Sequence, residues 1–198
     1  QLQRCHPVLR QSNCQLRVLL PLKIPEYAQP DVSIVVDAGE SATDVYRSVA
    51  AILFAFNRAT FDITLVHSLS REDRDRLQPL LDGLTFVEAL PGEPRSAAIN
   101  RAAFASKGRF IAFLGGQSEP ASRWLDELIY PVELFDRIGA VSAQLLDGNG
   151  RLRETGARFL ADGRLEAITG SGNPNSPEFS HTRQVDAVSR SGLLIERS

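Results

Sequence analysis

The sequence has few cysteines, no long apolar run and no marked excess of charge of either sign. Cys5 and Cys14 are the only cysteines among 198 residues, and they lie outside the periodic part of the chain. Their spacing matches neither a disulfide framework nor a paired metal-ligand pattern. We therefore expect two reduced thiols in a cytoplasmic protein.

The longest unbroken apolar stretch, Val49 to Phe56, has eight residues, whereas a membrane-spanning helix needs about 20. No charged start followed by an apolar run indicates a signal peptide. A formal net charge of -2 offers no basic footprint for nucleic acid or for an anionic membrane. The sequence thus predicts no transmembrane segment and no nucleic-acid partner.

The length and the 43% hydrophobic content suit one core, with an N-terminal linker or clasp at residues 1–30 and a single domain at 31–198. In that domain, strand-like runs alternate with helical patterns. The expected strands are 32–36, 63–66, 86–89 and 110–114. Strands separated by helices predict an α/β fold with a mainly parallel sheet flanked by helices.

Two helices can be outlined from their apolar faces. The first has Ser41 as N-cap with Asp44 three residues later, and its apolar face is formed by Val45, Val49, Ile52, Leu53 and Phe56. The second is expected to start at Pro120 and to contain Pro131, and its buried face is formed by Trp124, Leu125, Leu128, Ile129 and Val132.

The C-terminal third has a different pattern, which predicts an antiparallel hairpin region. We expect strands at 140–146, 152–160 and 165–168, joined by turns at 147–150 and 162–163. A polar loop follows at 170–182, and strand character returns at 185–195.

Ligands of open α/β sheets bind beyond the carboxyl ends of the strands, so the residues that follow each strand are the candidates for function. No Gly-x-Gly-x-x-Gly follows the first strand and no P-loop motif occurs, which argues against a dinucleotide oxidoreductase and a P-loop NTPase. Asp37-Ala38-Gly39 is a weak candidate for a phosphate turn, and a solvated aspartate closing the strand is the favoured interpretation. His67 is a candidate base or ligand, although a surface or hydrogen-bonded histidine is commoner at a strand end.

Several ordered blocks between Pro30 and about Arg197 resemble family 2 glycosyltransferases of the GT-A fold. The strands at 30–36 and 61–66 are similar to the family's first two strands. The segment 97–114 is similar to its Ala-x-Asn-x-Gly-x-x-x-Ala-x-Gly-x-Tyr-Ile-x-Phe-Leu block, and 119–128 to its Pro-x-x-x-Trp-Leu-x-x-Leu helix. The stretches 138–150 and 185–189 resemble the rhamnosyltransferase-like branch.

This resemblance implies a nucleotide-diphospho-sugar donor, a divalent metal on an Asp-x-Asp motif and a carboxylate base for the acceptor hydroxyl. The chain departs from the family at the expected carboxylates. His67-Ser68 replaces the aspartate after the second strand, and Gly115-Gly116-Gln117 replaces the metal motif. Ser189-Arg190-Ser191 replaces Ser-Gly-Ala, and the family's base lies beyond Ser198, so we expect a domain cut short at its C-terminus.

We therefore predict a degenerate, non-catalytic domain that acts as a structural or interaction module beside other domains of a larger carbohydrate-assembly protein. No cofactor is expected, and neither a catalytic residue nor a metal ligand is assigned. The alternative is an active hexosyl- or rhamnosyltransferase, with Mn or Mg or with metal-independent binding of a nucleotide-diphospho-sugar, and with its base outside this chain. A third interpretation is an unrelated α/β domain that binds phosphate at residues 37–39.

The resemblance places the remaining pocket at the strand ends. For Arg190 we favour a side chain turned to solvent over one that brings a cation to a phosphate. The candidate pocket residues are Asp37, Gly39, Glu40, His67, Ser68, Arg95, Asn100, Gly115, Gly116, Gln117, Asp186 and Arg190.

Overall fold

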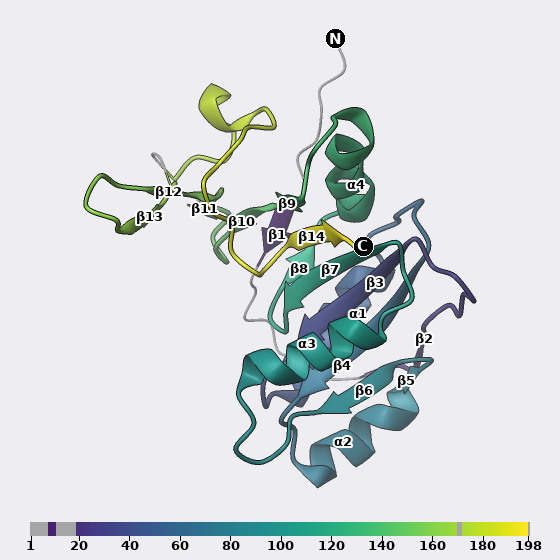
Figure 1. The fold of residues 1–198 in the computed structure, drawn as a ribbon. Coiled ribbons are helices and arrows are strands. Elements are labelled where there is room, and N and C mark those ends of the chain that lie inside the picture. Colours follow the sequence, from purple (N-terminus) through teal and green to yellow (C-terminus); the bar gives the residue numbers. More distant parts are fainter. Residues whose placement is uncertain (1–7, 11–18, 170–171, 198) are drawn as a thin grey trace.

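A six-stranded sheet forms the centre of the protein in the computed structural model, which describes residues 8–10, 19–169 and 172–197 (Figure 1). The four neighbouring strands β6, β4, β3 and β7 are parallel, and β14 runs antiparallel to both β7 and β9. In spatial order the strands are β6 (Thr85–Glu88), β4 (Phe61–His67), β3 (Val32–Asp37), β7 (Phe110–Gly115), β14 (Leu193–Glu196) and β9 (Ala140–Ser142). The predicted α/β class with a mainly parallel sheet is confirmed.

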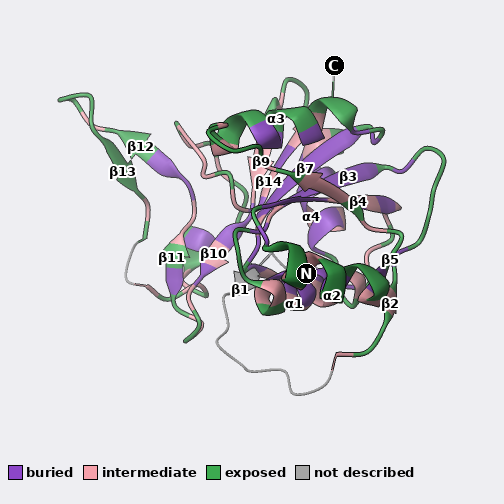
Figure 2. Cartoon of the chain, turned by 90° about the horizontal axis from the view of Figure 1, so that it is seen from below, coloured by how far each residue is buried: buried purple, intermediate pink, exposed green. Residues whose placement is uncertain are grey.

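Helices cover both faces of this sheet, and the strands are therefore buried on both sides (Figure 2). On one face α3 (Arg95–Ala105) packs Ile99 and its neighbours against alternate strand residues such as Val35. On the other face α1 (Ala42–Leu53) and α4 (Trp124–Leu134) enclose the larger core, with α2 (Arg71–Leu77) at the β4–β6 side. Burial on both sides explains why the central strands read as continuous apolar runs.

The start of α1 is as predicted, and its end is not. The Ser41 hydroxyl accepts a hydrogen bond from the backbone N–H of Asp44, which makes Ser41 the N-cap. Val49 and Ile52 are fully buried, but the helix ends at Leu53. Phe56, predicted on the apolar face, lies beyond the helix with a positive φ of 49° and is 76% exposed.

The second predicted helix starts later than expected. Pro120 lies in the short strand β8 (Glu119–Pro120), which pairs with β1 (Val8–Arg10). Arg123 then adopts a left-handed conformation with φ of 62°, so a right-handed helix cannot extend through this residue toward Pro120. α4 therefore begins at Trp124, and Pro131 lies inside it.

Hairpins form at both predicted turns, but the long strands predicted around them are divided. β10 (Gln144–Leu146) and β11 (Leu152–Glu154) pair across the first turn, and β12 (Ala157–Phe159) and β13 (Leu165–Ala167) across the second. The run 140–146 divides because β9 joins the central sheet, whereas β10 pairs with β1 and β11. The run 152–160 divides at Gly156, which has a φ of 96° and lies against the Val185 side chain.

The prediction of strand structure throughout 185–195 was wrong. Only Leu193–Glu196 forms a strand, and upstream of it the single bridge between Ala187 and Ala157 is the sole ladder contact described. A turn at Arg190, closed by the bond from Leu193 N–H to Arg190 C=O, separates the two parts. The loop before it, where described, contains the short 3-10 helix η2 (Pro177–Phe179).

The described part of the N-terminal segment packs on the domain. β2 (Leu22–Lys23) pairs in parallel with β5 (Leu81–Asp82), which follows the 3-10 helix η1 (Gln78–Leu80). Ile24 is buried in the larger core, and the Tyr46 hydroxyl donates a hydrogen bond of 2.7 Å to the carbonyl of Leu20. Cys5 and Cys14 lie outside the described residues.

Candidate functional site

The carboxyl ends of the three central parallel strands lie at one edge of the sheet. In the strand register Asp37 at the end of β3 is level with Val66 on β4 and with Gly115 on β7. This edge therefore brings the first, second and fourth predicted strand ends together, as sequence reasoning expected for open α/β sheets.

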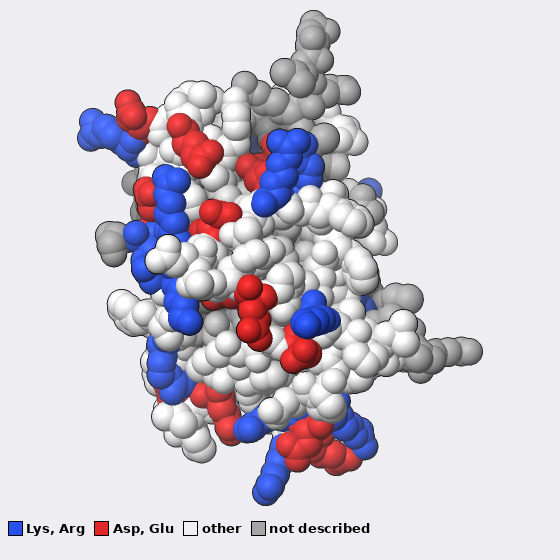
Figure 3. Space-filling model, turned by 90° about the vertical axis from the view of Figure 1, so that its right-hand side faces the viewer, with Lys and Arg blue, Asp and Glu red and all other residues white. Residues whose placement is uncertain are grey.

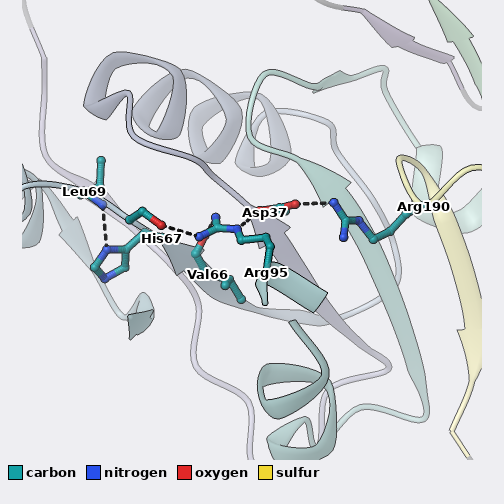
Figure 4. Close-up of polar contacts among 7 residues, drawn as sticks. Asp37, Val66, His67, Leu69, Arg95 and Arg190 are labelled. Atoms are coloured by element: carbon teal, nitrogen blue, oxygen red, sulfur yellow. Dashed lines mark hydrogen bonds and ion pairs between the residues drawn. The ribbon is translucent and has the colours of Figure 1, made fainter. Parts of the chain in front are cut away.

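Arg95, the first residue of α3, reaches across the end of β4 to the end of β3 (Figure 4). Its Nε atom donates to Asp37 Oδ1 at 2.5 Å, one terminal nitrogen donates to Ser68 Oγ at 2.9 Å, and the other donates to the Val66 carbonyl at 2.7 Å. Three bonds to three different groups fix the guanidinium at the sheet edge. Arg95, Asp37 and Ser68 are thus brought together from three elements.

Arg190 binds the second oxygen of the same carboxylate. A terminal nitrogen of its guanidinium donates to Asp37 Oδ2, so Asp37 lies between two arginines (Figure 4). The Arg190 side chain is 51% exposed, and that of Asp37 is 16% exposed. The expectation of a solvated Asp37 was wrong, because this carboxylate is mostly buried and paired with two arginines. Arg190 is half exposed, as expected, but the pairing of its guanidinium with Asp37 was not foreseen.

Glycines let the backbone approach closely around this carboxylate. The N–H of Gly116 donates to the backbone carbonyl of Asp37 at 2.7 Å, and a Cβ at Gly116 would lie 2.4 Å from Ala38 Cα. Gly39 has a φ of 59°, its carbonyl accepts from Ser68 N–H, and a Cβ there would meet nothing within 4 Å. The ends of β3 and β7 are therefore in close backbone contact at Gly116, whereas the space beside Gly39 is free of other protein atoms.

The segment that replaces the metal motif does not present a carboxylate. Gly115 and Gly116 have no side chain, and the Gln117 amide nitrogen donates to Asp44 Oδ2 at 3.0 Å. Glutamine is a poor ligand for a hard divalent cation compared with a carboxylate. Within the described residues, no group of three or more His, Cys, Asp or Glu side chains is placed to hold a metal ion. The side chains present do not fit the divalent ion that the family resemblance implies.

Two further candidates are exposed near this edge. Glu40 follows Gly39 in the turn before α1, and Asn100 lies on α3. Neither side chain belongs to the group formed by Asp37, Ser68, Arg95 and Arg190.

His67 is buried and belongs to a separate cavity. Its Nδ1 accepts a hydrogen bond from the Leu69 N–H at 3.3 Å, its ring makes an edge contact with Phe86, and its Nε2 has no partner. Burial lowers the pKa of His67 below its ordinary value, which favours the neutral ring. The cavity, of about 320 Å³, is further lined by Leu69, Arg71, Arg74, Asp75 and Glu88.

Asp186 lies away from the strand ends. Its carboxylate accepts a hydrogen bond from the Phe159 N–H at 2.9 Å, on strand β12. It also lines a cleft of about 710 Å³ between the end of α4, the edge strand β9 and residues 181–188. The predicted grouping of Asp186 with Asp37 is therefore not what the structure shows.

Sequence reasoning named Asp37, Arg95 and Arg190 separately but missed their pairing. The partners are 58 and 153 residues apart, and no local pattern links them. It named Ser191 only within the segment 189–191 and did not foresee that this hydroxyl would lie 3.1 Å from a Cβ at Gly115.

On the face drawn in Figure 3, Lys and Arg side chains follow one another along the left edge, and Asp and Glu side chains lie among and beside them. Among the described residues, no helix combines the length and the apolar character needed to cross a bilayer.

Comparisons with known proteins do not assign the chain to a family. No protein-family model matches it, and no curated protein matches it. Among solved structures, it is similar to the mannosyltransferase PcManGT from Pyrobaculum calidifontis in complex with GDP-Man and Mn2+, with a TM-score of 0.46 and 19% sequence identity. The match covers 62% of this chain and 37% of that chain, so this chain spans well under half of that protein's length.

Proposed function

We propose that this chain is a glycosyltransferase-like domain of the GT-A type that no longer transfers sugar and serves as a structural or interaction module in a carbohydrate-assembly protein. The observation that carries the proposal is the state of the strand ends. Asp37, the carboxylate at the end of the central strand, is bound by Arg95 and Arg190, and residues 115–117 at the end of β7 carry no carboxylate. A scaffold with intact packing and without acidic ligands is what loss of donor chemistry would leave.

The family resemblance and the sheet support the scaffold part of the proposal. The sequence blocks that resemble family 2 glycosyltransferases include β3, β4, α3, β7 and the start of α4, all of which contribute residues to the core. The strand ends support the loss of metal-dependent chemistry. A diphosphate leaving group needs a metal or a cationic clamp to offset its charge, and residues 115–117 lack the carboxylates that would hold a metal.

The alternative, an active glycosyltransferase with metal-independent donor binding, is favoured by one observation. Arg95 and Arg190 come from distant segments and converge at the edge where a donor diphosphate would lie. In that alternative the two guanidinium groups offset the leaving-group charge, and the base that accepts the acceptor proton lies outside this chain.

Titration calorimetry decides between these possibilities. The chain is titrated with UDP, GDP, dTDP and one matching sugar nucleotide, each with Mn2+ and with a chelator, and donor turnover is followed in parallel. We expect no metal-dependent binding and no turnover. Metal-dependent binding in the micromolar range would overturn the non-catalytic proposal, and turnover without metal would establish the alternative.

A gain-of-function variant tests the scaffold part. Gly115→Asp together with Gln117→Asp reintroduces the acidic spacing of the metal motif, next to Asp44. A Cβ at Gly115 meets only side-chain oxygens, those of Ser191 and Ser118, at 3.1 and 3.5 Å, so the backbone need not shift. We expect Mn2+ binding by the double variant and none by the single Gln117→Asp variant. Equal behaviour of both would argue against a glycosyltransferase-like arrangement of this edge.

A further inference from the structure

The cavity beside His67 lies on the opposite face of the sheet from the arginine group. His67 follows Ile63 and Leu65 at every second position of β4, and those two residues face the larger core, on the side of α1 and α2 (Figure 2). Val66, one position earlier, packs in the cluster beneath α3, on the side from which Arg95 reaches the strand ends. The cavity is therefore a second site, separate from the side chains grouped at the strand ends.

A buried hydrogen-bond donor without an acceptor belongs to this cavity. His67 has no exposed surface, yet it is one of the residues that line the cavity. Its Nδ1 accepts the Leu69 N–H, so the neutral ring carries its proton on Nε2. Among the described residues, Nε2 has no partner. An unsatisfied buried donor costs about 1–3 kcal/mol, so a ligand that supplies an acceptor gains a hydrogen bond that the free protein lacks.

Two arginines of α2 supply further donors around the cavity. Arg74 lies 3.6 Å from the Glu88 carboxylate, and Arg71 lies 3.9 Å from that of Asp75. Both distances exceed that of a hydrogen bond, so the N–H groups and the carboxylate oxygens of each pair stay available. The Arg74 and Glu88 side chains are 43% and 61% exposed. The cavity thus combines a buried neutral donor with charged groups of both signs on its solvent side.

These groups restrict the chemistry of a ligand. The protonated Nε2 of His67 cannot ligate a metal ion, and it requires an acceptor atom. The two arginines and two carboxylates of the lining cancel in formal charge, which disfavours a dianion. A volume of about 320 Å³ lies at the small end of ligand pockets. A small monocarboxylate meets these conditions, because one oxygen can accept from the ring and the other from a guanidinium group.

We propose that this cavity binds a small carboxylate ligand, whose oxygens accept hydrogen bonds from His67 Nε2 and from the Arg74 guanidinium group. The ligand replaces Glu88 as the partner of Arg74, and the exposed Glu88 carboxylate stays in contact with solvent. This inference goes beyond the proposed function, and it holds whether or not the strand ends bind a nucleotide.

The test is a nuclear magnetic resonance titration of the whole isotope-labelled chain with sodium acetate. It is followed through the ring nitrogens of His67 and the backbone amide of Leu69, and sodium chloride at matched concentration controls for ionic strength. We expect saturable shifts with acetate, with a dissociation constant in the millimolar range, and none with chloride. Neutral glycerol should cause no saturable shift. Sulfate should bind more weakly than acetate, because its second charge is repelled by Asp75 and Glu88.

Three variants test the assigned contacts. Arg74→Gln should weaken acetate binding roughly tenfold, because it removes a charged hydrogen-bond donor. His67→Phe keeps a ring and removes the N–H group, so the saturable response of the Leu69 amide should be lost. Glu88→Gln should strengthen binding roughly threefold, since it removes an exposed competitor for Arg74.

Arg76→Gln is the matched control. Arg76 is also an exposed arginine of α2 with a carboxylate partner, Glu72 at 2.5 Å, but it is not among the residues that line the cavity. Acetate affinity should be unchanged in this variant. Thermal unfolding of each variant is recorded, and if His67→Phe does not fold, Arg74→Gln and Glu88→Gln decide the test.

Three outcomes overturn the inference. They are a His67 ring that does not respond saturably to acetate, which would leave the cavity to water, equal affinity of the wild type and Arg74→Gln, and a response to glycerol or sulfate as strong as that to acetate. These results are separable from the proposed function, which fails through metal-dependent binding of a nucleotide or through turnover.

Discussion

The central sheet and the segment 155–192 are held in place by different forces. Ile34 on β3 and Leu65 on β4 have no exposed surface, whereas Phe159 on β12 and Leu165 on β13 are 61% and 55% exposed. The hairpin projects from the body of the protein, and its residues are largely exposed in Figure 2. The sheet is stabilised by burial of apolar surface. In the segment, Phe179 packs with Leu146 and Leu152 in a small separate cluster, and hydrogen bonds and ion pairs hold the exposed hairpin.

The candidate site lies where these two regions meet. Asp37 belongs to the buried sheet, and Arg190 belongs to the end of the segment, just before β14 returns to the sheet. Arg95, from the helix that covers one sheet face, completes the group. A site assembled across such a junction can change its arginine geometry while the core remains intact.

The largest difference between the two regions should appear when matched leucines are truncated. Leu114→Ala in β7 removes a side chain that is 2% exposed and should cost about 3 kcal/mol in the free energy of unfolding. Leu165→Ala in β13 should change it by less than about 0.5 kcal/mol. Urea denaturation followed by circular dichroism measures both. Similar losses in the two variants would mean that the hairpin is part of the cooperative core.

Sequence patterns predicted the central sheet much better than the segment 155–192. The apolar runs around Ile34 and Leu114 and the cap at Ser41 specify local structure directly, because burial and capping act over a few residues. Where residues are exposed, as in β12, the pattern does not locate the ends of a strand. The division at Gly156 depends on contact with Val185, 29 residues later, which no local pattern encodes.

The difference between local and long-range contacts also explains which features of the candidate site could be predicted. Sequence reasoning placed Asp37 and Gly115 at one edge because parallel strands end together. It favoured a solvent-exposed Arg190, since a lone arginine gives no indication of its partner. The pairing with Asp37 is fixed only when β14 inserts beside β7, which is a property of the whole sheet.

A smaller loss of stability is expected when a methyl group is added at Gly116, where the ends of β3 and β7 lie in close contact. Gly116→Ala should cost about 1–3 kcal/mol in the free energy of unfolding, because the new Cβ meets backbone atoms of Ala38 at 2.4 Å. Gly139→Ala, at an exposed glycine where a Cβ meets nothing within 4 Å, is the control and should be neutral or slightly stabilising. Thermal or urea unfolding distinguishes them, and an unaffected Gly116→Ala variant would show that β3 and β7 can separate at this end.

Removing the Arg190–Asp37 ion pair, which links the segment 155–192 to the central sheet, should change local stability and leave global stability nearly unchanged. Arg190→Gln should reduce the global free energy of unfolding by less than about 1 kcal/mol, since the ion pair is half exposed on the arginine side. Amide hydrogen exchange should nevertheless become faster in residues 185–192 and stay unchanged in β3 and β4. Faster exchange throughout the sheet would contradict the division into a buried scaffold and a hydrogen-bonded segment.

The smallest effect expected is a pH dependence of stability that comes from the buried His67. Burial lowers the pKa of His67 in the folded state, with the Glu88 carboxylate opposing this and the Arg74 and Arg95 guanidinium groups adding to it. The unfolded chain therefore takes up a proton first, so stability should fall as the pH drops through about 6.5 and level off below the folded-state pKa. Urea midpoints measured from neutral pH to about pH 5 should decline more in the wild type than in His67→Gln. His181→Gln, at an exposed histidine of the C-terminal segment, should decline like the wild type, and a His67→Gln variant with the wild-type slope would assign the pH dependence to other groups.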